Sequence, residues 1–559
     1  MKLRRRGQSN HSQFELNASS VTAWANKLPR ANLAESSKQL YKTLDELSNL
    51  DCSFRQRLET LEALRPSIHL ILQGLQPRYL NASIVLPEKT AAVVRLCNRF
   101  NNYLADNYRQ AVEDILSHSW TSRFRQSLAL AVHRELTERS VLLLRSYLLY
   151  QSEQPNCWEQ LHRCYQISRK HKLNPIRVDD PCHGSCTVEQ AYLRPMLFVG
   201  AHPYQMSQQA QLTLHETLHQ LSSNARIQTS DPRKCCFIFN PQGNQPPIYQ
   251  ELCEDSEGFL GINTSDLIEV ISEQVRGGKN DDNKLPPQLS SKLLEAWSSI
   301  SDREDRHAER RNLELTVGLS STHFFVAGEQ PLEAISQPLS YDNGDRKGRS
   351  SPATKTHPQK STLSTNPVEE IDYSEPQKQN KKNKSNINRH FTVETVNVSR
   401  RGYYIAWPAT ESTQLRTGEV LGLREGDAPC WSVGCVRWIK KHSEEELQVG
   451  IEILSHAAES YVARLLDQEQ PTYRALLLGA ESTLGTPSRL LLPNISMSEG
   501  SELVLTQPAG SFCLQLKQQL SSTRDFAVYE YDAIVKENDE GLVQEDSANE
   551  EFSELWESL

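Results

Sequence analysis

Apolar residues recur at helical spacing through the first 225 residues, and this pattern constrains the fold more than any other feature of the chain. In the segment 34–50, Leu40, Leu44 and Leu47 stand three or four positions apart, as residues on one helix face do. The same pattern continues in the segments 54–75, 88–117, 121–151 and 157–172. Because short proline-marked joints separate these segments, we expect an all-α domain at 20–225, built as a helical bundle or a stack of hairpins. A flexible N-terminus at 1–19 precedes it.

The hydrophobic pattern changes after residue 225. The segments CCFIFN (235–240) and GFLGINT (258–264) have the apolar character of short strands, and helical patterns follow at 265–278 and 285–300. We therefore expect residues 226–302 to form a mixed α/β connector.

Strand patterns separated by turn residues dominate the chain after residue 303. Residues 312–326 have strand character, which we expect to extend through His323–Val326. Five more strand patterns lie within 390–454, at a spacing typical of a small antiparallel barrel. A helix at 457–468 is predicted to close this barrel, so that the barrel domain spans 303–467.

A second β-rich segment is expected at 468–535, where apolar strand patterns continue. With the helical N-terminal half, this gives an α+β fold class with several domains: an all-α bundle or hairpin stack, an antiparallel β-barrel and a further β-rich segment.

Two stretches lack the apolar residues that a core needs. Residues 330–388 are rich in Ser, Pro, Lys, Gln, Asn and Thr, and we expect them to form a disordered insertion in the barrel domain. Residues 536–559 form an acidic tail that ends in a short amphipathic helix. We expect this helix to bind a groove on a protein partner or on the helical domain. Its apolar face consists of Phe552, Leu555, Trp556 and Leu559.

Composition narrows the class of partner and the compartment. A net charge of −9 with a pI near 6.0 disfavours nonspecific binding to DNA. The sequence contains no run of about 18 apolar residues, so we expect no membrane span. The basic N-terminus lacks the apolar region of a secretory signal. The twelve cysteines are expected to be reduced thiols. These features predict a cytoplasmic protein.

Two motifs become neighbours in the ordered chain once the insertion is set aside. Arg306 and Arg310 form an R-x-x-x-R before a strand, and Asn397, Ser399 and Gly402 form an N-x-S-x-x-G at a strand end. Arginine can bind phosphate or guanine O6 and N7 through its planar fork, and it stacks on bases. The Asn397 amide suits a guanine edge, the Ser399 hydroxyl suits guanine or phosphate, and glycine lets the backbone approach closely.

This order of motifs and strands resembles that of the PilZ family of bacterial cyclic di-GMP receptors. The segments LRTGEVLGL, WSVGCVRWI and LQVGIEIL are similar to the later strands of that family's six-stranded barrel. The resemblance implies cyclic di-GMP as the ligand and no further cofactor. It also implies an arginine clamp at Arg306 and Arg310, facing a barrel surface that contains Asn397, Ser399 and Gly402.

Other arginines nearby leave alternatives open. Arg311, Arg400 and Arg401 are possible additional ligand contacts, and Arg303 or Arg311 could replace one arginine of the clamp. The resemblance implies a receptor that passes the ligand state to the helical domain, and onward to pilus, flagellar or biofilm control. The alternative is a scaffold protein with a PilZ-like barrel that binds protein but no nucleotide. The long separation of the two motifs favours this alternative.

A second motif points to different chemistry. His215, Glu216 and His219 form a literal H-E-x-x-H, the pattern of zinc metalloproteases. The carboxylates of Glu251 and Glu254 lie in a loop-like context, so no third ligand is clear. Leucines at helical spacing already explain this segment as a packing helix, which leaves a zinc hydrolase as a remote alternative.

A group of cysteines could also be drawn as a zinc cluster. The spacings C-x6-C and C-x3-C differ from the usual C-x2-C pairs, so buried thiols are the better interpretation. The residues concerned are Cys157, Cys164, Cys182, His183 and Cys186. No phosphate-binding glycine-rich loop or nucleophile elbow is present. We therefore expect no catalytic residues and no metal site.

Overall fold

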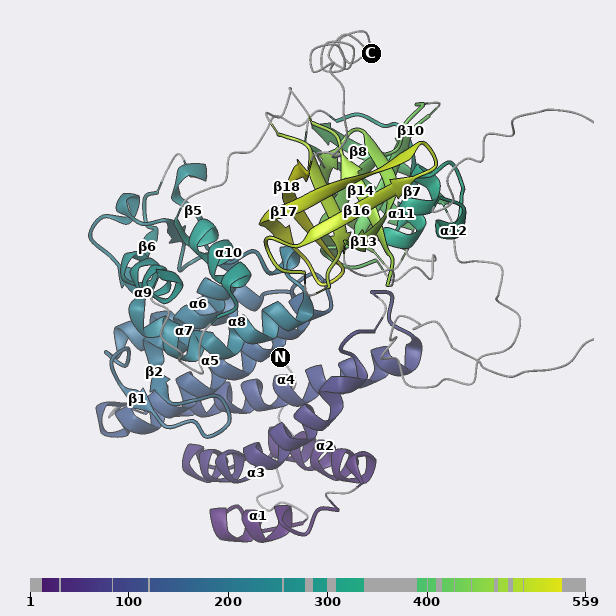
Figure 1. Ribbon diagram of the computed structural model, residues 1–559. Coiled ribbons are helices and arrows are strands. Elements are labelled where there is room, and N and C mark those ends of the chain that lie inside the picture. The colour runs from purple at the N-terminus through teal and green to yellow at the C-terminus, as the bar shows by residue number, and fades with distance from the viewer. Residues whose placement is uncertain are drawn as a thin grey trace, which may run out of the picture. The chain divides into compact units, whose positions relative to one another are not determined.

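In the computed structural model, helices fill the N-terminal region where apolar residues recur at helical spacing (Figure 1). Helix α3 shows the local cause. Ser53 caps its first turn by accepting from the Gln56 backbone N–H, and the Gln56 side chain accepts from Ser53 N at 3.2 Å. Leu61, Leu64 and Ile68 on its inner face are fully buried. The helices of this region are α1 (Ala18–Ala25), α2 (Leu33–Asn49), α3 (Phe54–Leu75), α4 (Glu88–Leu116), α5 (Arg125–Leu148), α6 (Cys157–Lys170), α7 (Val188–Gly200) and α8 (Gln208–Leu221).

The structure describes most of the 559 residues. These are 13–29, 32–82, 84–118, 121–253, 256–276, 285–298, 308–335, 390–399, 401–408, 415–426, 428–443, 445–466, 471–480, 486–495 and 497–534. They divide into two units: Met1–Val317 with Phe391–Leu454, and Gly318–His390 with Ser455–Leu559. The first unit holds the helical region and one barrel, and the second holds another barrel.

Helix α5 is the centre of the helical region, because it packs against α4, α6, α7 and α8. Its turns are buried on almost every side, and buried charges such as Arg134 and Glu138 therefore need partners on other elements. Short 3₁₀ helices join several of the elements. They are η1 (Gln76–Arg78), η2 (Thr121–Phe124), η3 (Pro203–Gln205), η4 (Ser222–Asn224), η5 (Pro232–Lys234) and η6 (Gln250–Leu252).

A hairpin interrupts the helices inside the region predicted to be all-α, and a small sheet and two helices follow α8, as the change of pattern after residue 225 predicts. Strands β1 (Arg177–Val178) and β2 (Cys186–Thr187) form a hairpin between α6 and α7. A four-stranded sheet has the order β3-β6-β4-β5. Its strands and the helices after it are β3 (Arg226–Gln228), β4 (Phe237–Phe239), β5 (Ile248–Tyr249), β6 (Leu260–Asn263), α9 (Ser265–Arg276) and α10 (Pro287–Ser298).

The first barrel is closed, in the strand order β10-β11-β12-β9-β8-β7, with β7 pairing back to β10. Alternate residues of its strands fill the interior, among them Leu315, Ile405, Trp407 and Val449. The strands are β7 (Asn312–Val317), β8 (His390–Ser399), β9 (Gly402–Pro408), β10 (Val420–Glu425), β11 (Ser432–Lys441) and β12 (Glu446–Ser455).

Tyr150 joins the helical region to this barrel. It follows α5 in a left-handed conformation (φ 53°), which is uncommon for a bulky residue, and its side chain is buried in the barrel's hydrophobic core. Its hydroxyl donates to the Met206 carbonyl oxygen at 3.0 Å, and Lys441 N donates to the Tyr150 carbonyl oxygen at 2.7 Å. The helical region and the first barrel therefore share a core residue.

The second unit contains another closed barrel, in the order β13-β14-β15-β18-β17-β16. The predicted α+β class is thus confirmed, and the second β-rich segment is a barrel in its own right. The elements of this unit are α11 (Leu319–Val326), α12 (Leu332–Ile335), β13 (Ala458–Leu465), β14 (Tyr473–Leu478), β15 (Arg489–Pro493), β16 (Glu502–Gln507), β17 (Gly510–Ser522) and β18 (Phe526–Ile534).

Two local predictions were wrong. The helix expected at 457–468 is strand β13, because Tyr461 and Ala463 alternate into the core of the second barrel. The first barrel therefore ends with β12, and β13, which the sequence assigns to it, belongs to the second. The strand expected at His323–Val326 is helix α11. Gly318 ends β7 with φ 85°, and His323 Nε2 then donates to the Tyr461 carbonyl oxygen at 2.9 Å.

Several sequence predictions lie outside the described residues. They concern most of the 330–388 insertion, the first residues of the N-terminus, and the tail with Phe552, Leu555, Trp556 and Leu559. Among the described helices, none combines the length and the apolar character that a membrane span requires.

Candidate functional site

The N-x-S-x-x-G motif forms a tight hairpin between β8 and β9. Ser399 pairs with Gly402 in the strand register, and the Ser399 hydroxyl donates to the Gly402 carbonyl oxygen at 3.3 Å. A Cβ on Gly402 would lie 2.0 Å from the carbonyl oxygen of Ile451 on β12. Only glycine therefore lets β9 approach its neighbour this closely.

A β-bulge before this hairpin changes which side chains face outward. The register shifts between Thr395 and Asn397. Val393 and Thr395 are buried on one side of it, whereas beyond it Val398 is the residue that packs against the core. The bulge thus turns Asn397 and Ser399 to the outer face of the barrel, a common effect of bulges beside functional sites.

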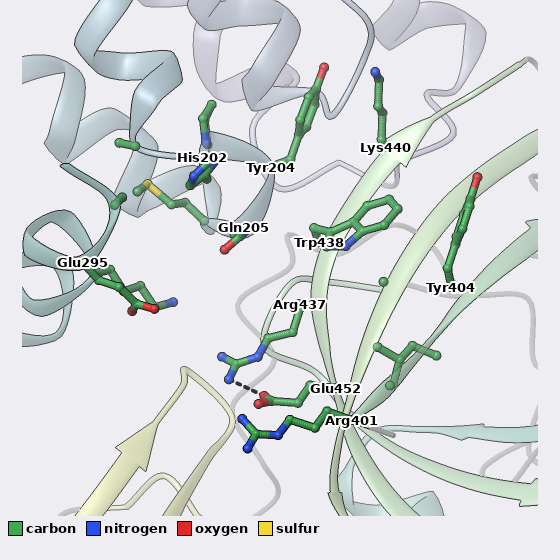
Figure 2. Close-up of a pocket in the computed structure, with 18 of the residues that line it drawn as sticks. His202, Tyr204, Gln205, Glu295, Arg401, Tyr404, Arg437, Trp438, Lys440 and Glu452 are labelled. Atoms are coloured by element: carbon green, nitrogen blue, oxygen red, sulfur yellow. Dashed lines mark ion pairs between the residues drawn. The ribbon is translucent and has the colours of Figure 1, made fainter. Parts of the chain in front are cut away.

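Asn397 and Ser399 line a cavity of about 810 Å³ (Figure 2). One wall is the outer face of β8, β9, β11 and β12. The opposite wall comes from the helical region and its connector, through η3 with its flanking residues and α10. Every residue of both walls belongs to the first unit. The motif therefore opens into a space that the helical region helps to enclose.

Positive charge predominates in the cavity lining. Four cationic side chains, Arg401, Arg437, Lys440 and Lys292, face two carboxylates, Glu295 and Glu452. Figure 2 labels both arginines on the barrel wall, where Arg437 forms an ion pair with Glu452. Burial, and then repulsion from Arg437, lowers the pKa of Lys292. A bound anion would favour the charged form of this lysine and raise its pKa again.

Aromatic rings cover the upper part of the barrel wall in Figure 2. The ring centroids of Tyr404 and Trp438 are 5.5 Å apart, at an interplanar angle of 48°. On the opposite wall, the Tyr204 ring centroid lies 5.5 Å from Lys440 Nζ. Such surfaces can stack on a nucleobase, because every base has a π-face.

The arginine arm is described only at its end. Arg303, Arg306 and Arg400 lie outside the described residues. Arg311 N donates to Thr395 Oγ1 at 2.8 Å, and Thr395 Oγ1 donates to the Glu309 carbonyl oxygen at 2.7 Å. The arm thus runs beside β8, two residues before Asn397.

Two arginines of this arm differ in their surroundings. The Arg311 guanidinium forms ion pairs with Glu309 and Glu425, each at 2.8 Å, and these carboxylates raise its pKa. Arg310 is exposed and does not line the cavity. The structure therefore brings Asn397, Ser399 and Gly402 together with Arg401, and leaves Arg310 outside this group.

The cationic and aromatic residues Lys292, Arg437, Trp438 and Lys440 were missed at the sequence level. Three of them stand in one strand pattern, WSVGCVRWIKK, where a tryptophan between cations on a half-exposed strand was an available signal. Lys292 gave no signal, because only the fold brings α10 to the barrel.

Among the described residues, which do not include Glu254, the H-E-x-x-H motif has no third ligand close to it. It lies on α8, where Glu216 is exposed and the rings of His215 and His219 are 5.9 Å apart between centroids. Burial lowers the pKa of His215 to about 3 and that of His219 to about 4. In the part of the chain that the structure describes, neither histidine joins a group of three side chains close enough to share an ion.

The cysteines weighed as a zinc cluster in the sequence do not gather around one point in the described residues either, in keeping with their interpretation as buried thiols. Cys157 and Cys164 are buried on α6, and Cys186 contacts His133 Nε2 at 3.3 Å. The structure gives each of these cysteines as a free thiol. Only His183 of that group belongs to a three-residue set of close potential ligands among the described residues.

Three family models match consecutive parts of the chain. "Cyclic-di-GMP receptor FimW, N-terminal domain" matches residues 19–233, "Cyclic-di-GMP receptor FimW, middle PilZ domain" matches 236–460, and "FimW C-terminal beta-barrel domain" matches 461–534. The Cyclic-di-GMP receptor FimW of Pseudomonas aeruginosa (strain PAO1) is 29% identical over 595 aligned residues, which cover 99% of this chain and 97% of that relative. No solved structure matches the chain.

Proposed function

This chain belongs to the FimW family of cyclic-di-GMP receptors, and we propose that it binds cyclic di-GMP in the cavity beside the β8–β9 hairpin. One observation carries the proposal: the bulge in β8 turns Asn397 and Ser399 into a cavity with excess positive charge and aromatic walls. Its volume of about 810 Å³ is in the usual range for small-ligand sites, about 300–1,000 Å³.

The lining offers a partner for each part of this ligand. The two phosphates match the excess of two positive charges, and Arg401 is a suitable bidentate donor. The Asn397 amide and the Ser399 hydroxyl suit a guanine edge, and Trp438 with Tyr404 suits its face. Arg306 and Arg310 would clamp the ligand from the arm, whereas the charge of Arg311 is already matched by two carboxylates.

The receptor would pass the ligand state to the helical region directly. Because His202, Tyr204 and Lys292 line the wall opposite the barrel, a bound ligand would touch both walls. Ligand binding would then favour one arrangement of the two walls over others. The output would be pilus, flagellar or biofilm control from the cytoplasm. A protein partner would bind through the helical region or the C-terminal face of Phe552, Leu555, Trp556 and Leu559.

Calorimetric titration of the full chain with cyclic di-GMP tests the proposal. The wild type should bind the ligand with a stoichiometry of one site per chain. Asn397→Ala should weaken the affinity about tenfold, which is the effect of losing one hydrogen bond to a buried group. Val396→Ala is the matched control, because this neighbouring side chain is exposed and does not line the cavity. A folded wild type without affinity for the nucleotide would favour the scaffold alternative.

A further inference from the structure

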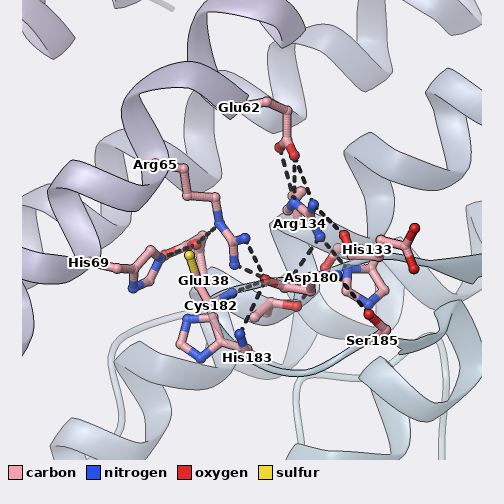
Figure 3. Close-up of polar contacts among 12 residues, drawn as sticks. Glu62, Arg65, His69, His133, Arg134, Glu138, Asp180, Cys182, His183 and Ser185 are labelled. Carbon is pink, nitrogen blue, oxygen red and sulfur yellow. Dashed lines mark hydrogen bonds and ion pairs between the residues drawn. The ribbon is translucent and has the colours of Figure 1, made fainter. Parts of the chain in front are cut away.

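Three potential metal ligands meet in the core of the helical region, and none of them lines the cavity. His69 lies on α3, Glu138 on α5, and His183 in the β1–β2 hairpin. The ligand atoms of all three lie within 4.8 Å of one another. His69 Nε2 is 2.9 Å from Glu138 Oε1, and the two imidazole centroids are 4.5 Å apart. Figure 3 shows the three side chains converging beside Arg65 and Asp180.

One imidazole nitrogen of this cluster stands out in the described part of the chain. His183 Nε2 is buried and has no hydrogen-bond partner among the described residues. A buried polar atom left unpaired costs about 1–3 kcal/mol, and such atoms are rare in native cores. This nitrogen lies beside a carboxylate and a second imidazole, which is the environment of a bound cation.

Surrounding contacts hold Glu138 and the hairpin that carries His183 in place. Asn101 Nδ2 donates to Glu138 Oε2 at 2.7 Å, and Arg65 Nε donates to Glu138 Oε1 at 2.8 Å. In the hairpin, Asp180 Oδ1 accepts from the backbone N–H groups of Cys182 and His183 at 3.0 and 3.2 Å. Outer contacts of this kind orient the ligands of metal sites.

The Glu138 carboxylate shares its guanidinium partner, Arg65, with Asp180. Arg65 donates to both oxygens of Asp180, at 2.7 and 3.0 Å. Arg134 forms a second bidentate pair with Glu62, at 2.8 Å for the Nη2 contact. Arg65 also donates to Glu138, and Arg134 also pairs with Asp180, so these two guanidinium groups face three carboxylates in all.

We propose that His69, Glu138 and His183 bind one divalent transition-metal ion, with Zn²⁺ as the best fit. Two imidazole nitrogens and one carboxylate are a known zinc ligand set, with water or a further residue in the fourth position. Cys182, which adjoins His183, is the candidate for that position. On binding, the His69 Nε2 lone pair replaces its hydrogen bond to Glu138, and the proton moves to Nδ1 or to solvent. The ion would tie α3, α5 and the hairpin together, independently of nucleotide binding.

Elemental analysis of the purified full-length protein tests this site. After incubation with Zn²⁺ and gel filtration, the wild type should retain about one zinc per chain. His183→Ala and Glu138→Gln should retain less than about a fifth of that. His215→Ala is the matched control, because this histidine belongs to the H-E-x-x-H motif and should leave the zinc content unchanged.

Thermal unfolding gives an independent readout. Added Zn²⁺ should raise the Tm of the metal-stripped wild type, since an ion that binds only the folded state stabilises it, and should not raise that of Glu138→Gln. A wild type without retained zinc and without a Tm shift would mean that the cluster holds only protons or a buried water, which overturns the proposal. Zinc lost only in the His215→Ala variant would move the site to α8 and overturn it equally.

Discussion

The indole of Trp438 covers Gly450 on the adjacent strand so closely that a Cβ at position 450 would lie 2.0 Å from its Nε1 atom. Gly450 therefore provides the space in which Trp438 rests against the barrel. Both residues line the cavity, and Tyr404 lies next to the indole. The stacking surface of the proposed ligand site thus depends on residue 450 having no side chain.

Gly450→Ala should displace Trp438 and weaken cyclic di-GMP binding by about tenfold, the effect of losing one base–aromatic stack. Calorimetry measures the affinity, and circular dichroism checks the fold. Gly479→Ala is the matched control, because a Cβ there would meet the Ala457 carbonyl oxygen at 3.4 Å, an ordinary contact. If a folded Gly450→Ala protein keeps full affinity, Trp438 does not contact the ligand.

Arg306→Ala and Arg310→Ala should each weaken cyclic di-GMP binding by at least about tenfold, since each removes a charge-assisted contact to phosphate or guanine. Arg311→Ala should change the affinity less than about threefold, because Glu309 and Glu425 already hold that guanidinium. The three variants are compared by titration at one salt concentration. Unchanged affinity in both of the first two would remove the arm from the site.

Ligand affinity should decrease as the pH rises into the alkaline range, and it should do so below the usual pKa of lysine. Burial and Arg437 lower the pKa of Lys292 in the free protein. Bound phosphates would raise it again, so binding takes up a proton and weakens once Lys292 is neutral. Titrations across pH measure this step, and Lys292→Met should abolish it. A step that persists in this variant belongs to another group.

Arg65→Met should destabilise the helical region by about 3–5 kcal/mol, because it leaves the buried carboxylates of Glu138 and Asp180 without their shared cation. Urea unfolding followed by far-UV circular dichroism measures the change. Arg95→Ala is the control: its ion pair with Glu88 is exposed and should contribute less than about 1 kcal/mol. Equal stability of the two variants would show that the buried pairs contribute little.

Periodicity alone predicted most helices well, since their apolar faces are local features of the sequence. The segment 54–75 coincides with α3 (Phe54–Leu75). Strand β13 was mistaken for a helix because its Ala, Glu, Arg and Leu residues favour helices, while the alternation of Tyr461 and Ala463 is short. Tertiary pairing with β14 and β16 decided the outcome.

The motif residues of the site were accessible to sequence reasoning, but the cavity was not. The N-x-S-x-x-G pattern identified Asn397 and Ser399 as candidate ligand residues. The β-bulge that turns them outward could not be predicted, because no residue type in this strand signals it. Lys292 is brought to the cavity by packing between elements distant in sequence. For the same reason His69 and Glu138, which are 69 positions apart, form no recognisable metal motif.

The position of Tyr150 also limits how far the first barrel is portable. Its ring is part of the barrel's hydrophobic core, although its backbone lies in the helical region, two residues after the end of α5. A barrel transplanted into a chimera without α5 would lack that ring and would expose the apolar surface around it. The first barrel therefore cannot be exchanged by itself. A transferable module would have to begin before α5, so its boundary would lie inside the helical region, which otherwise looks like a separate domain.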